Sequence, residues 1–135
     1  MKQILLDTMI IYDILTEENK TGPYHELAQA IDDEKITGVI SVVTLTEIIH
    51  FLGDVYKEKI NGLLSSKLEI IDIDRMIAIR GGEFRKNTGL STGDALIAAT
   101  GVLENVKHIL TDDTHFDDFG YLKKINLKTA LKMAR

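Results

Sequence analysis

The stretch that decides the fold of this protein is KQILLDTMIIYDIL, residues 2–15. It consists of an apolar run, then Asp7, then a second apolar run whose only acid is Asp13. We predict a short buried strand over residues 2–7 and a helix over residues 9–15 that leaves it. Asp7 therefore lies where a strand gives way to a helix. It could be the N-cap of that helix, or it could belong to a functional site.

The rest of the chain repeats this alternation of strand and helix. The further expected strands are 36–41, 68–73, 107–111 and 123–127, and the further expected helices are 23–35, 44–53, 55–66, 75–87 and 93–104. Strands that alternate with helices predict right-handed crossovers, a parallel sheet and helices on both faces. We therefore expect an α/β fold, a three-layer α/β/α sandwich with a central, mostly parallel sheet. In such folds ligands bind beyond the carboxyl ends of the strands.

The composition indicates one soluble domain, residues 1–135, because no repeat, low-complexity segment or linker divides the chain. No apolar stretch approaches the roughly 20 residues needed to span a bilayer. The absence of cysteine and of a signal-peptide pattern predicts a cytoplasmic protein without disulfides or a Cys-based zinc site. The net charge of −5 argues against nonspecific coating of nucleic acid. It leaves open an enzyme acting on nucleic acid, because bound divalent ions reverse the local charge.

Acidic residues recur at the ends of the expected strands and in the first turns of the helices that follow. Besides Asp7, these acids are Glu47, Asp94, Asp112 and Asp113. Each also has a structural explanation. Thr44 and Ser91 each precede one of these acids by three residues, which is a helix-capping pattern, and TDDT at 111–114 could be a turn.

Four carboxylates gathered at one rim of a sheet are harder to explain structurally. Half-buried carboxylates repel one another, which raises their pKa values and destabilises the fold unless a cation is present. Mg²⁺ and Mn²⁺ take hard oxygen ligands, and such ions activate water and stabilise the leaving oxygen in phosphodiester hydrolysis. The acids together therefore favour a metal-dependent phosphoryl enzyme.

At this point the residues resemble a known family. The sequence is similar to PIN-domain nucleases, and within them to the VapC-type toxin ribonucleases of toxin–antitoxin pairs. The matching segments are LLDTMIIYDIL (5–15), SVVTLTEII (41–49), GLSTGDALIAAT (89–100) and ILTDDTHFDDF (109–119). They follow the order of the family and extend over almost the whole chain, and the third is the most specific.

The resemblance implies a set of site residues. The metal-binding acids of the family fall on Asp7, Glu47, Asp94 and Asp113, with the adjacent Asp112 as the alternate for the last. Thr8 and Thr111 are the matching polar residues that support the site. The resemblance further implies Mg²⁺ or Mn²⁺ as cofactor, RNA as substrate, a homodimer, and a cognate antitoxin protein as partner.

Two other functions remain possible from the sequence. An aspartate-nucleophile phosphatase would use Asp7 as its nucleophile, but Met9 stands where that pattern needs a second Asp. A PIN-like scaffold that binds RNA or protein without hydrolysis is the other alternative, although all four acids are present.

Several basic residues and one histidine are left over. Arg80, Arg85 and Lys86 lie ahead of Asp94 and could clamp a phosphate or could form a solvated helix face. The basic tail, residues 123–135, offers the same choice. We expect His115 to be a surface or packing residue rather than a catalytic one.

Overall fold

A computed structural model of the chain describes residues 2–135. The strands are β1 (Gln3–Leu6), β2 (Thr37–Ser41), β3 (Glu69–Ile71), β4 (His108–Leu110) and β5 (Lys123–Ile125). They form one sheet in the order β3-β2-β1-β4-β5, and every neighbouring pair is parallel. The predicted α/β class is confirmed, and the sheet is wholly parallel rather than mostly so.

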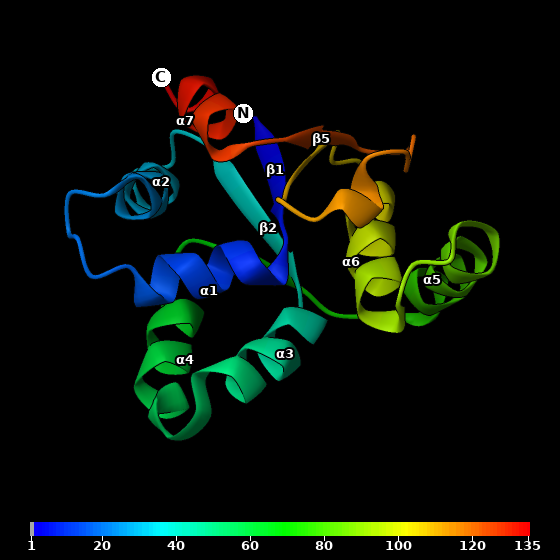
Figure 1. Ribbon diagram of the computed structural model, residues 1–135, viewed down its shortest axis with the longest axis horizontal. Helices are drawn as coiled ribbons and strands as arrows, with labels where there is room; N and C mark the ends of the chain where they lie inside the picture. Colours follow the sequence, from blue (N-terminus) through cyan, green and yellow to red (C-terminus); the bar gives the residue numbers. More distant parts are fainter. Residues whose placement is uncertain (1) are drawn as a thin grey trace.

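Helices cover both faces of this sheet (Figure 1). They are α1 (Thr8–Thr16), α2 (Pro23–Asp32), α3 (Val43–Leu52), α4 (Tyr56–Leu64), α5 (Arg75–Thr88), α6 (Thr92–Leu103) and α7 (Leu127–Met133), with short 3-10 helices η1 (Gly53–Val55) and η2 (Thr114–Phe116). None of the helices within residues 2–135 has the length and apolar character needed to cross a membrane.

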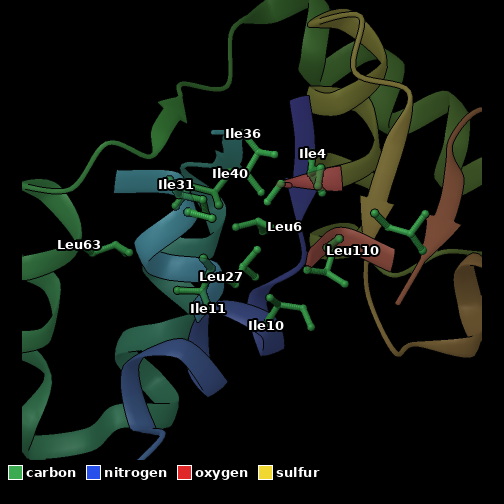
Figure 2. Close-up of a cluster of buried hydrophobic side chains, with 14 of the residues drawn as sticks. Ile4, Leu6, Ile10, Ile11, Leu27, Ile31, Ile36, Ile40, Leu63 and Leu110 are labelled. Carbon is green, nitrogen blue, oxygen red and sulfur yellow. The ribbon is translucent and has the colours of Figure 1, made fainter. Parts of the chain in front are cut away.

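The apolar residues of the strands divide between two cores because successive side chains of a strand point to opposite faces. In β1, Ile4 and Leu6 enter the core shared with α1, α2 and α7, whereas Leu5 enters the core beneath α5 and α6. Figure 2 shows the first of these cores, with side chains from β1, α1 and α2 packed together. A strand buried on both faces needs a continuous apolar run, which explains the sequence ILL at 4–6.

The order of the strands reverses direction between β1 and β4. The chain moves outward from β1 through β2 to β3, then returns to place β4 on the other side of β1. In an open parallel sheet, ligands bind at this reversal, beyond the carboxyl ends of the strands. Asp7 directly follows β1, and Asp113 follows β4 by three residues.

Two details differ from the sequence-based expectations. The basic tail contains α7, which the sequence analysis did not predict; Asn126 caps it by accepting a hydrogen bond from the Thr129 N–H at 2.9 Å. Thr44 does not cap α3, because that helix begins at Val43 with Val42 as its N-cap. The buried Thr44 lies inside the helix instead and has another partner, described below.

Candidate functional site

Asp7 caps a helix, as one of the two interpretations of the opening stretch predicted, and it is also a member of an acidic cluster. Its carboxylate Oδ1 accepts a hydrogen bond from the Thr8 N–H at 2.8 Å, which caps α1. Its Oδ2 accepts a second hydrogen bond from the Thr111 hydroxyl at 2.6 Å. Only 6% of Asp7 is exposed, so these two bonds fix the carboxylate at the end of β1.

Threonine hydroxyls connect Asp7 to two further acids. The Thr8 hydroxyl donates to Glu47 Oε1 at 2.7 Å and lies 3.0 Å from the Thr44 hydroxyl. On the other side, the Asp113 N–H donates to the Thr111 hydroxyl oxygen at 3.0 Å. Thr8 and Thr111, the two residues that the family resemblance implies as support, thereby donate to the carboxylates of Glu47 and Asp7, and Thr111 also holds the backbone of Asp113.

The first turn of α6 supplies the fourth acid, Asp94. The predicted cap is present, since the Ser91 hydroxyl accepts a hydrogen bond from the Asp94 N–H at 3.2 Å. Gly93 allows α3 and α6 to approach closely, because a Cβ there would lie 2.7 Å from Glu47 Oε2. The glycine before Asp94 thus leaves room for Glu47, a contribution that the sequence analysis did not identify.

His115 lies beside two of the acids. Its Nδ1 is 3.1 Å from Asp113 Oδ1 and 3.9 Å from Asp94 Oδ2, and 72% of its side chain is exposed. One ligand atom from each of Asp94, Asp113 and His115 can be chosen such that all three lie within 4.8 Å of one another. His115 is a surface residue, as expected, but its contact with the acids was missed; its position two residues after Asp113 was the available signal.

Asp112, the alternate for Asp113, lies in a different environment. It is exposed, and its charge acts on Tyr24 rather than on the clustered acids. Burial and the Asp13 carboxylate raise the pKa of Tyr24 to about 12, and Asp112 adds a smaller repulsion against the phenolate. The geometry therefore groups Asp113 with the other three acids.

Crowding and burial make the cluster electrostatically unfavourable in the absence of a cation. Burial, followed by repulsion from Asp7 and Asp113, raises the pKa of Asp94 from 3.8 to about 6. Burial also raises the pKa of Asp7, although the hydrogen bond from Thr111 works in the opposite direction. Among residues 2–135, no Lys or Arg forms an ion pair with any of these four acids.

This donor set fits a hard divalent cation. Carboxylate oxygens are the ligands that Mg²⁺ and Mn²⁺ prefer, and a bound cation would offset the repulsion that raises the pKa of Asp94. A purely structural cluster would be expected to contain a lysine or arginine for neutralisation, because unpaired buried charges are costly. The absence of such a partner within the described part of the chain supports the metal interpretation.

Comparison with known families decides the identity of the fold. The model of the PIN domain family matches residues 4–121. The chain belongs to the PIN domain family. This match includes Asp7, Glu47, Asp94 and Asp113 and confirms the resemblance found in the sequence. No curated protein sequence matches this chain.

Solved structures share the PIN fold of the protein over nearly their full length. VapBC2 from Rickettsia felis, bound to a DNA fragment from its promoter, has a TM-score of 0.74 at 22% identity and covers 92% of this chain and 98% of its own. DNA-bound VapBC from Salmonella typhimurium has a TM-score of 0.73 at 22% identity, covering 94% and 99%. A toxin–antitoxin complex from Klebsiella pneumoniae has a TM-score of 0.70 at 24% identity, covering 92% and 97%.

Proposed function

We propose that this PIN domain is a metal-dependent endoribonuclease that hydrolyses RNA phosphodiester bonds and acts as the VapC-type toxin of a type II toxin–antitoxin pair. The observation that carries the proposal is the convergence of four carboxylates, without a basic partner within residues 2–135, beyond the carboxyl ends of β1 and β4. The similarity in fold to the VapBC complexes supports the toxin assignment.

We assign the metal site to Asp7, Glu47, Asp94 and Asp113. These four residues would hold Mg²⁺ or Mn²⁺, which would supply activation of water and charge stabilisation at phosphorus. Asp7 is the least mobile ligand because both of its oxygens accept hydrogen bonds. We assign Thr8 and Thr111 as positioning residues, since their hydroxyls donate to the carboxylate oxygens of Glu47 and Asp7.

The charge of the site also explains why a cation is needed before RNA can approach. The four acids would repel the phosphates of a nucleic acid, and the whole chain carries a net charge of −5. A bound divalent ion offsets part of this negative charge, which reduces the repulsion of a phosphodiester that approaches the cluster. Cleavage should therefore depend on metal both for binding of the substrate and for chemistry.

The comparisons support one of the expected protein partners, the antitoxin. The Klebsiella relative is a toxin–antitoxin complex, which supports a cognate antitoxin for this chain. We also propose a homodimer, and light scattering on the purified protein should give twice the mass of one chain. A monomer at micromolar concentration would contradict the dimer without affecting the nuclease assignment.

The test is cleavage of a mixed RNA pool by the purified protein in EDTA, in Mg²⁺ and in Mn²⁺. We expect cutting only with metal, and none with Asp94→Asn. Asp118→Asn, which removes an exposed acid from the same loop as Asp113, is the control and should cut normally. Asp113→Asn should abolish cutting and Asp112→Asn should retain it; the reverse pattern would move the fourth ligand to Asp112.

Two results would point to a different function. Cleavage that survives in EDTA, or in the Asp94→Asn variant, would contradict the metal site. Metal binding by calorimetry without cutting of any RNA would indicate a PIN-like scaffold rather than a nuclease.

A further inference from the structure

A pocket of about 440 Å³ opens beside the acidic cluster, between the end of α5 and the start of α6. Its lining residues are Arg85, Gly89, Leu90, Ser91 and His115. His115 connects the pocket to the cluster through its contacts with Asp113 and Asp94. None of the five lining residues is acidic, so the pocket differs in charge from the cluster beside it. Two larger pockets lie elsewhere and contain none of the four acids.

Arg85 is the cationic residue of this pocket, and its guanidinium is held in position. Its Nη1 donates to the Thr92 hydroxyl oxygen at 2.9 Å, which ties the last turn of α5 to the first turn of α6. Within residues 2–135 no carboxylate pairs with it, so its charge is not neutralised. A guanidinium has five N–H donors, and the fork geometry of the remaining ones suits the oxygens of a phosphate.

The two other basic residues of α5 do not share this arrangement. The guanidinium of Arg80 lies 5.1 Å from the centre of the Phe84 ring and 5.6 Å from that of Tyr121, so it packs on aromatic rings. Lys86 is exposed and does not line the pocket. The structure therefore separates one candidate phosphate ligand, Arg85, from two cations with other surroundings.

Two uncharged residues, Gly89 and Leu90, form part of the lining of the pocket. Gly89 ends α5 with a φ of +74°, a conformation that other residues rarely adopt, and it contributes no side chain. The next residue, Leu90, is buried and anchors the turn in the core beneath α5 and α6. These two residues give the pocket an uncharged lining next to Arg85.

We propose that this pocket binds a backbone phosphate of single-stranded RNA next to the phosphate held at the acidic cluster, with Arg85 as the positioning residue. The inference rests on the proposed function. An RNA strand that places one phosphate at the cluster must continue across its rim. On one side of the cluster this path leads past His115 into the pocket, which contains the unpaired guanidinium of Arg85. A flexible single strand can follow such a path, because its backbone is not fixed in a helix.

The test compares Arg85→Gln with Lys86→Gln. The second variant is the control, because it removes a positive charge from the neighbouring residue of the same helix. Binding of a fluorescein-labelled pool of unstructured RNA is measured with Mg²⁺ present in the Asp94→Asn background, where the strand is not cut and the cluster carries one negative charge fewer, over a range of KCl concentrations. We expect Arg85→Gln to raise Kd about five- to tenfold and to reduce the slope of log K against log[salt] by about 0.7. Lys86→Gln should change Kd less than twofold.

Steady-state cleavage with Asp94 intact gives a second readout. Arg85→Gln should raise KM and leave kcat within about twofold, because the residue holds the strand and does not touch the reacting atoms. Arg85→Lys keeps the positive charge but loses the forked N–H donors of the guanidinium. Its affinity for RNA should therefore lie between those of Arg85→Gln and the unmodified protein. Melting curves of each variant exclude loss of folding as the cause.

The outcomes separate the two proposals. If the unmodified protein cleaves RNA, but Arg85→Gln and Lys86→Gln behave alike in binding, salt slope and KM, the pocket is not a phosphate site and the nuclease assignment stands. If the unmodified protein neither cleaves nor binds RNA in the presence of metal, the proposed function fails and the inference fails with it.

Discussion

Replacing Asp94 with Asn should stabilise the metal-free protein while removing its activity. The pKa of Asp94 is about 6 in the folded protein and 3.8 in an unperturbed chain. At pH 7 this difference corresponds to at most about 3 kcal/mol of destabilisation. The side chain is 19% exposed, so screening by water reduces this to about 2 kcal/mol. Asn also loses the favourable interaction of an acid with the first turn of α6, about 0.3–1 kcal/mol. The expected net gain is about 1 kcal/mol.

The direction of the pH dependence follows from the raised pKa. Between about pH 4 and pH 6 the folded protein holds the Asp94 proton while the unfolded chain has released it. The free energy of unfolding therefore rises as the pH falls through this window, and the full penalty is present above pH 6. This contribution should be absent from the Asp94→Asn variant.

Urea denaturation in EDTA, at pH values from 5 to 7.5, measures both effects. Asp74→Asn is the matched control, because Asp74 caps α5 through the Ile77 N–H at 2.9 Å and Asn caps equally well. It should lower stability by about 0.3–1 kcal/mol, because it too loses the interaction of an acid with the start of a helix. Saturating Mg²⁺, at about 100 times its Kd, should stabilise the unmodified protein by about 2.7 kcal/mol and Asp94→Asn much less. An Asp94→Asn variant that is less stable than the unmodified protein in EDTA, or equally stabilised by Mg²⁺, would refute the reasoning.

Three further predictions concern other parts of the molecule. Thr111→Val removes the hydroxyl that donates to the buried Asp7 and should cost about 1–3 kcal/mol in urea denaturation, with Thr114→Val, an exposed site nearby, as a control of small effect. Gly93→Ala places a methyl group against Glu47 and should weaken Mn²⁺ binding in calorimetry, while stability changes by at most about 1 kcal/mol; unchanged affinity would show that Glu47 is not held there. Asn126→Ala removes the cap of α7 and should lower stability by about 1 kcal/mol without altering cleavage of RNA, so an effect on activity would reveal a role for the basic tail.

The sequence predicted most of the fold because its apolar runs are short and separated by clear helical patterns. The run ILL before Asp7 and the helix pattern after it correspond to β1 and α1. The helix α7 was missed because it has only seven residues, and because its cap, Asn126, follows a strand directly. A basic composition concealed the helical spacing of Leu127, Ala130 and Leu131.

The site was predicted only in part, for a physical reason. Acids at the carboxyl ends of strands can be identified from the sequence, because each expected strand has a defined last residue. The contacts of His115 and Gly93 depend on how η2 and α6 pack against α3, which no local pattern encodes. The double role of Asp7, as a cap and as a member of the cluster, likewise becomes visible only when Thr111 is found 2.6 Å away.

The order in which the chain supplies the acids has a consequence for protein synthesis. The four carboxylates come from positions 7, 47, 94 and 113, and β4, which precedes the last of them, pairs directly with β1. A growing chain on the ribosome cannot complete the cluster until residue 113 of 135 has left the exit tunnel and β4 has inserted beside β1. Whatever reaction the cluster performs therefore requires residue 113, and premature termination before that point yields fragments without the complete cluster.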